Sequence, residues 1–256
     1  MSKISAAFKN KKLFIAYIMA GDPSLAKTKE FILAARRAGA GLVEVGIPFS
    51  DPVAEGEVIQ RANLRALKQK INLDKVFDMV ASIKDKINIP LVFMTYLNPV
   101  FNYGYEKFFK QCARCGVSGV IIPDMPFEEQ GEIKPAAAKN GVDVLTLVSP
   151  SSSDARIKAI AENAQGFIYL VSSYGVTGVR KNINTDISAI VKKIKRHTDV
   201  PVAVGFGIST PEQAAEFAKH ADGVIVGSAI VKIIENYGPA AAPRVEKYIK
   251  SMCKGL

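Results

Sequence analysis

Apolar runs rich in Val, Ile, Phe and Tyr alternate with segments of helical period from one end of the chain to the other. This alternation indicates repeated strand-helix units and a parallel sheet, whose strands are covered on both faces. We predict eight such units. The expected strands are Leu13–Met19, Leu42–Val45, Leu91–Tyr96, Gly119–Ile122, Asp143–Leu147, Phe167–Val171, Val202–Val204 and Gly223–Val226.

Helices are expected between the strands, with an extra N-terminal helix at Lys3–Lys9 and a final helix at Pro239–Met252. Thr210 and Gln213 are spaced as a capping box, which marks one helix start. Eight units in 256 residues predict an α/β fold of the (β/α)8 TIM barrel type, as a single domain over 1–256. The alternative is a doubly wound open sheet, which would have G-x-G-x-x-G after an early strand. Only Gly205-Phe206-Gly207 is present, after the seventh strand.

The formal charge of +10 comes from basic residues that are dispersed along helix-like segments. Because the chain has no Trp and no basic stripe interleaved with aromatic residues, a nucleic-acid surface is disfavoured, and an anionic small-molecule substrate suits the charge better. No apolar run reaches the roughly 18 residues of a membrane span, and the N-terminus has no apolar signal region. We therefore expect a cytoplasmic protein.

Three cysteines are too few for a disulfide framework. Cys112 and Cys115 form a CxxC pair inside a predicted helix, without a second pair to complete a zinc site. We expect them to be partly buried helix residues, and we predict no metal site.

Glu44 is the most informative candidate for chemistry, because it lies inside the apolar run of a predicted buried strand. A carboxylate costs several kcal/mol in such a place unless it is paired or neutral, and perturbed carboxylates concentrate at active sites. The alternative is a glutamate that loop amides satisfy fully. In a barrel, functional residues gather where strands end, and the nearby strand ends offer a second carboxylate. The candidates are Asp22, Asp51, Glu55 and Asp124.

Loops after the seventh and eighth strands carry Gly207, Gly227 and Ser228, and the loop after the sixth carries Gly178. Such loops often bind phosphate together with the N-terminus of a short helix, here expected at Ala229–Asn236. The alternative is that these glycines serve tight turns alone. No strand carries a lysine for a Schiff base, and both histidines lie at helix ends. Carboxylate acid-base catalysis by Glu44 therefore remains.

Three motifs closely resemble the tryptophan synthase α subunit family: VEVGIPFSDPVAEG, Gly175-Val176-Thr177-Gly178, and VGFGIST with VIVGSAIVKIIE. The resemblance covers essentially the whole chain. It implies a TIM-barrel lyase of tryptophan biosynthesis that cleaves indole-3-glycerol phosphate to indole and glyceraldehyde 3-phosphate. It also implies an α2β2 complex, in which indole passes to a β subunit. That partner holds the pyridoxal phosphate, so no cofactor is expected in this chain.

By the same resemblance, Glu44 is expected to protonate indole C3 and to handle the glycerol hydroxyl proton. Glu55 stands where the family has an aspartate that binds the indole N1–H. The longer side chain moves the carboxylate by about one C–C bond, and a misplacement near 1 Å can cost on the order of 100-fold in rate. This departure leaves a second hypothesis open, a catalytically weakened α subunit that acts mainly as an allosteric activator of the β subunit.

The resemblance assigns further positions. The expected substrate-binding residues are Tyr17, Ile59, Tyr96, Tyr169, Thr177, Gly178, Phe206, Gly207, Gly227 and Ser228, and the expected partner-interface residues are Asp51, Asn98 and Pro126. Thr177 resembles the loop residue that closes over substrate, whereas Ile59 and Phe206 could equally be core residues. A third hypothesis is another phosphate-binding barrel of the same pathway, such as an isomerase or indole-glycerol-phosphate synthase. The synthase would have a basic strand-end residue, which we do not find.

Overall fold

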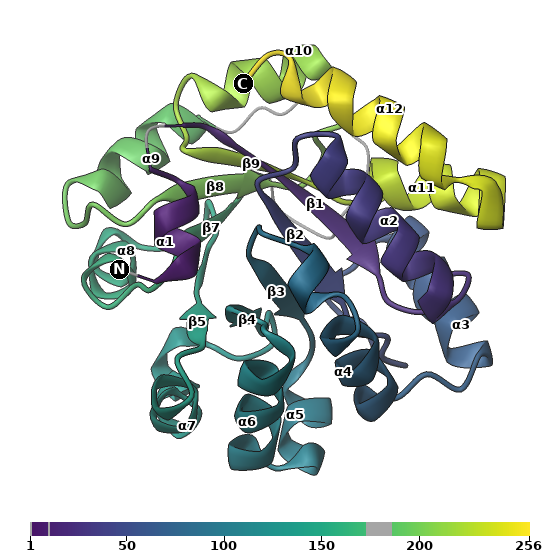
Figure 1. The fold of residues 1–256 in the computed structure, drawn as a ribbon. Helices are drawn as coiled ribbons and strands as arrows, with labels where there is room; N and C mark the ends of the chain where they lie inside the picture. The colour runs from purple at the N-terminus through teal and green to yellow at the C-terminus, as the bar shows by residue number, and fades with distance from the viewer. Residues whose placement is uncertain (1, 10, 173–185) are drawn as a thin grey trace.

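The computed structural model describes residues 2–9, 11–172 and 186–256, and its parallel strands curl into a barrel surrounded by helices (Figure 1). The strand order is β5-β4-β3-β2-β1-β9-β8-β7-β6. The strands are β1 (Leu13–Met19), β2 (Leu42–Gly46), β3 (Leu91–Met94), β4 (Gly119–Ile121), β5 (Asp143–Leu145), β6 (Leu147–Val148), β7 (Ile168–Val171), β8 (Val202–Gly205) and β9 (Gly223–Val226). The predicted TIM barrel is confirmed.

Thr146 divides one predicted strand in two and closes the barrel. β5 pairs with β4 and β6 pairs with β7, and only Thr146 separates β5 from β6. The amide of Tyr169 donates to the Thr146 carbonyl at 3.0 Å, while the Thr146 hydroxyl donates to Oε1 of Gln130 at 3.1 Å. Residues 143–148 therefore act as one kinked strand that changes neighbours, so the eight predicted strands account for the nine observed.

Helices surround the barrel on its outside (Figure 1). They are α1 (Lys3–Ala7), α2 (Leu25–Arg37), α3 (Glu57–Lys68), α4 (Leu73–Ala81), α5 (Leu97–Tyr103), α6 (Tyr105–Cys115), α7 (Lys134–Lys139), α8 (Asp154–Glu162), α9 (Ile187–Lys195), α10 (Pro211–Ala218), α11 (Ser228–Tyr237) and α12 (Ala242–Cys253), with short 3-10 turns at Lys84–Lys86, Phe127–Glu132 and Gly238–Ala240. The capping box of Thr210 and Gln213 is present at the start of α10. The last helix begins three residues later than predicted, because a 3-10 turn holds Gly238–Ala240.

Alternation along the strands separates two apolar regions and decides which side chains reach the interior. Ala16 and Ile18 of β1 belong to the core between sheet and helices, whereas Ile15 and Tyr17 point into the barrel. Glu44 is the register partner of Tyr17 on β2, so it points inward as well. The interior face of the strands thus carries the candidate carboxylate.

Cys112 and Cys115 both lie on α6 as buried free thiols. Within residues 2–9, 11–172 and 186–256, no helix is long and apolar enough to cross a membrane.

Candidate active site

One cavity opens at the carboxyl ends of the barrel strands, and it collects most of the residues that the sequence predicted. Its floor and walls come from β1, β2, β3, β7 and β9 and from the segments that follow β2, β8 and β9. The lining residues are Tyr17, Glu44, Glu55, Ile59, Met94, Tyr169, Phe206, Gly207, Ile208, Ile225, Gly227 and Ser228.

Glu44 lies on β2 with only 2% of its surface exposed. Its Oε2 atom makes no hydrogen bond with the described residues. Burial, and secondly the neighbouring charge of Glu55, raise the pKa of Glu44 to about 8. The side chain therefore keeps its proton at neutral pH and can act as a general acid.

Glu55 follows β2 in the loop that leads into α3, and it is 3% exposed. Its Oε2 accepts a hydrogen bond of 2.6 Å from Nδ2 of Asn63 on α3. Burial raises the pKa of Glu55 to about 7, and the bond from Asn63 acts in the opposite direction. Because this pKa lies below that of Glu44, Glu55 ionises first as pH rises, which gives the two carboxyl groups different roles.

Two tyrosines lie across glycines of neighbouring strands. A Cβ atom on Gly46 would meet the hydroxyl and ring of Tyr17, and one on Gly205 would meet those of Tyr169. Both rings therefore need a glycine on the next strand in order to lie flat against the barrel wall. The arrangement leaves an aromatic floor close to Glu44.

Phe206 and Gly207 turn the chain after β8 with φ angles of +78° and +82°. A left-handed backbone is uncommon for a bulky residue such as Phe, and such positions cluster at functional sites. The hydroxyl of Ser172 donates to the Phe206 carbonyl. The Phe206 ring packs edge-on against Tyr169, with centroids 6.0 Å apart. This turn places Gly207 on the cavity wall.

The N-terminus of α11 borders the same cavity through Gly227 and Ser228. Gly227 is the N-cap residue and has no side chain to bond the first-turn N–H groups. Free N–H groups and the helix dipole make such an end a binding site for an anion.

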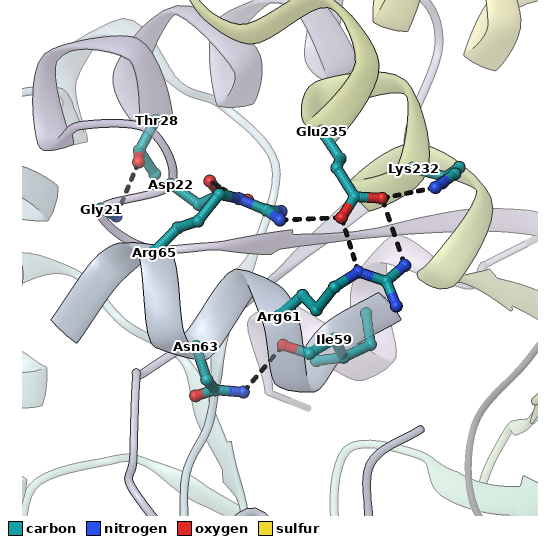
Figure 2. A network of polar contacts seen from close by, with 9 residues as sticks. All are labelled: Gly21, Asp22, Thr28, Ile59, Arg61, Asn63, Arg65, Lys232 and Glu235. Atoms are coloured by element: carbon teal, nitrogen blue, oxygen red, sulfur yellow. Dashed lines mark hydrogen bonds and ion pairs between the residues drawn. The ribbon is translucent and has the colours of Figure 1, made fainter. Parts of the chain in front are cut away.

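A network of ion pairs joins α3 to α11 (Figure 2). Arg61 and Arg65 of α3 both donate to Oε1 of Glu235 on α11, at 2.7 and 3.0 Å, and Lys232 donates to Oε2 at 2.6 Å. Arg65 also holds both oxygens of Asp22 at 2.8 Å, and Asp22 is 2% exposed. The bond from Arg61 is the largest cause that lowers the pKa of Glu235, to about 2. The network fixes two helices whose N-terminal turns both line the cavity, through Ile59 of α3 and Ser228 of α11.

Among the four candidates for the second carboxylate, only Glu55 lines the cavity. Asp22 belongs to the ion-pair network, Asp51 bonds Ser50 at the surface, and Asp124 accepts from the amide of Leu97 at 2.9 Å.

Tyr96 does not line the cavity and instead contacts the loop that follows β2. Its ring stacks on Phe49 with centroids 5.2 Å apart, and its hydroxyl accepts a bond of 3.2 Å from the amide of Ala54. Tyr96 thus supports the loop that carries Glu55.

Thr177 and Gly178 lie outside the described residues. The three predicted interface residues, Asp51, Asn98 and Pro126, are exposed.

Met94, Ile208 and Ile225 line the cavity without having been predicted as site residues. Met94 and Ile225 follow the inward alternation of their strands, which is the signal that could have identified them.

Comparisons with known proteins agree over the whole chain. A family model described as Tryptophan synthase alpha chain matches residues 4–254. The tryptophan synthase alpha chain of Lactiplantibacillus plantarum is 50% identical over 100% of this chain and 97% of its own length, and that of Lacticaseibacillus casei is 48% identical over 98% and 94%.

Solved structures give the same result. The alpha chain from Legionella pneumophila superposes with a TM-score of 0.89 at 34% identity, covering 100% of this chain and 97% of its own. A chain from the tryptophan synthase a2b2 complex of Pyrococcus furiosus superposes with a TM-score of 0.88 at 37% identity, covering 95% and 99%. This chain therefore belongs to the tryptophan synthase alpha chain family, as its three motifs predicted.

Proposed function

We propose that this chain is a carbon-carbon lyase that cleaves indole-3-glycerol phosphate to indole and glyceraldehyde 3-phosphate, with residues 1–256 as one catalytic domain. One observation carries the proposal: two buried carboxyl groups with pKa values raised into the neutral range share a single cavity. Membership of the alpha chain family supplies the reaction class.

In the proposed reaction, Glu44 gives its proton to C3 of the indole, and Glu55 as a carboxylate accepts a hydrogen bond from the indole N1–H. The protonated ring then takes up the electron pair of the bond between C3 and the first glycerol carbon. As that bond breaks, the hydroxyl on the glycerol carbon loses its proton to the ionised Glu44 and becomes the aldehyde oxygen. The proton count balances, and the oxidation of the carbinol carbon to an aldehyde is matched by the reduction of indole C3, so the step needs no external oxidant or reductant. General acid-base groups of this kind contribute about 100- to 10,000-fold in rate.

The phosphate is proposed to lie against Gly207, Gly227 and Ser228. The first-turn N–H groups of α11, which no side chain of the described residues caps, support this placement, because they and the helix dipole favour an anion. The pyridoxal phosphate chemistry of the family is assigned to the β subunit. The proposed role of this chain is therefore to release indole.

We further propose a cytoplasmic α2β2 assembly in which a β subunit contacts Asp51, Asn98 and Pro126. These three residues are exposed, and two large apolar side chains, Val53 and Phe101, lie close to them in the sequence with 71% and 65% of their surface exposed. The a2b2 complex of the Pyrococcus furiosus relative supports a partner of this kind.

The test is an assay of indole release from indole-3-glycerol phosphate by the purified chain, with and without β subunit, beside Glu44→Gln. We expect activity in the unmodified chain, a loss of at least about 100-fold in the variant, and a rate increase when β subunit binds. Absence of cleavage in both states would contradict the lyase. If β-subunit activity still rises, the result would favour the catalytically weakened activator.

A further inference from the structure

We propose that the hydroxyl of Tyr17 donates a hydrogen bond to the glycerol oxygen of the substrate that becomes the aldehyde oxygen. This inference rests on the proposed function and assigns a role to an atom rather than to the ring that carries it. Its starting point is that Tyr17 lines the cavity and that its Oη atom is buried without a hydrogen-bond partner among the described residues.

The burial of this hydroxyl makes the lack of a partner significant. Tyr17 is 5% exposed, and leaving a buried hydroxyl without a partner is unfavourable. Buried polar groups normally find partners, so an orphan at a binding cavity points to a ligand atom. Burial, followed by the charges of Glu55 and Glu44, raises the pKa of Tyr17 well above its ordinary value of 10. The hydroxyl therefore stays protonated and acts as a donor.

The strand order places Tyr17 between the two ends of the proposed substrate. β1 pairs with β2, which carries Glu44, and with β9, which leads into Gly227 and Ser228. The indole end of the substrate is assigned to β2 and the phosphate end to β9. The glycerol chain between them must therefore cross β1. Among the strands of the described residues, no other strand pairs with both β2 and β9.

The direction of the side chain selects one part of that glycerol chain. The Cβ and Cγ atoms of Tyr17 lie next to Gly227, whereas its hydroxyl lies over Gly46, on the strand of Glu44. The hydroxyl is thus at the end where the C–C bond breaks. A donor there stabilises the oxygen as it gains carbonyl character, as other preorganised donors do.

A pair of ligands that differ only in the glycerol hydroxyls tests the proposal. Tyr17→Phe keeps the ring between Gly46 and Gly227 and removes only the hydroxyl. For the substrate we expect kcat/KM to fall about 10-fold or more, mainly in kcat. For indole-3-propanol phosphate, which has no glycerol hydroxyl, we expect an inhibition constant within about 2-fold of the unmodified chain, which also reports that the cavity is intact.

Tyr103→Phe is the matched control, because the hydroxyl of Tyr103 bonds Asp74 at the surface, away from the cavity. The inference would be overturned by a kcat/KM unchanged in Tyr17→Phe, or by equal losses for substrate and analogue. A shift of the pH profile without a loss at its plateau would also overturn it, since the hydroxyl would then serve a carboxylate. Failure of the proposed function looks different, because the unmodified chain would then neither release indole nor bind the analogue.

Discussion

The amide of Asn63 donates a hydrogen bond of 2.6 Å to the carboxylate of Glu55, and both side chains are buried. Asn63 also accepts from the amide of Phe49 at 2.9 Å, so it fixes Glu55 with respect to the loop after β2. One α3 side chain thus holds both the charge state and the position of the carboxylate proposed to bind indole.

Asn63→Ala should move the acid limb of the pH profile to higher pH. The bond from Asn63 lowers the pKa of Glu55, so its loss raises that pKa above about 7, and the ionised form needed for binding indole N1–H appears later. The pH dependence of kcat/KM for indole release measures this. Asn140→Ala, which removes an amide bonded to Ala136 at the end of α7, is the control. An acid limb that stays at the same pH in Asn63→Ala would show that Asn63 does not affect the ionisation of Glu55.

Glu44→Gln should stabilise the unliganded protein at high pH relative to the unmodified chain. Burial, and secondly the charge of Glu55, raise the folded-state pKa of Glu44 to about 8 from the ordinary value of 4.5, so the folded state binds an extra proton between these pH values. The stability contribution is present below pH 4.5 and is lost as pH rises through 8. At about 1.4 kcal/mol per pKa unit, the variant should gain roughly 4 kcal/mol of unfolding free energy relative to the unmodified chain between pH 5 and pH 9.

Urea unfolding at the two pH values measures that gain, with Glu129→Gln at an exposed position as control. If the free energies of unfolding of variant and unmodified chain differ by the same amount at pH 5 and at pH 9, Glu44 has an ordinary pKa in the folded protein.

Glu55 variants test whether the longer side chain is accommodated. Because Asn63 bonds the carboxylate at 2.6 Å in its present place, Glu55→Asp should lower the rate or leave it unchanged, and Glu55→Ala should nearly abolish it. Steady-state indole release measures both. A rise in Glu55→Asp would mean that the loop has lost activity and that Asp restores it, while a silent Glu55→Ala would remove the residue from the mechanism.

Ser228→Asp should weaken substrate binding without weakening the fold. A carboxylate at the start of α11 suits the helix dipole but repels a phosphate at the same place. We expect KM for indole-3-glycerol phosphate to rise about 10-fold or more. We expect KM for indole-3-glycerol, which lacks the phosphate, to change little. If KM rises equally for both substrates, the phosphate does not bind at this helix end.

Arg65→Met should cost more stability than Arg61→Met, although both arginines bind Glu235. Arg65 is the partner of buried Asp22, so its removal leaves an uncompensated buried charge, at a cost of roughly 3 kcal/mol. The pair that Arg61 makes is more exposed and solvent-screened, so its loss should cost clearly less. Urea unfolding of the two variants gives the comparison directly, and equal losses would show that Asp22 does not depend on Arg65.

Periodicity was enough to predict the barrel but not its closure. The apolar run that continues past Leu145 into Val148 gives no sign that Thr146 separates two pairings, because the change of neighbours comes from the stagger of a closed sheet. Closure is a property of all strands together, and the sequence pattern of a single strand does not contain it.

Glu44 was predictable because a charged residue in an apolar strand stands out locally. The ion pairs of Arg65 were not, because its partners Asp22 and Glu235 lie 43 and 170 positions away, and each is an ordinary acidic residue in its own segment. Tyr96 was placed in the cavity by resemblance, whereas its bond to Ala54 depends on the path of a loop.

The crossing of Tyr17 over Gly46, and of Tyr169 over Gly205, also has a consequence for redesign. At each crossing the two positions share a single volume, so a side chain added at the glycine must be matched by a smaller residue at the tyrosine. Variants intended to accept bulkier aryl groups should therefore be searched as two residue pairs. Libraries that vary one member alone would sample mostly overpacked or hollow barrels.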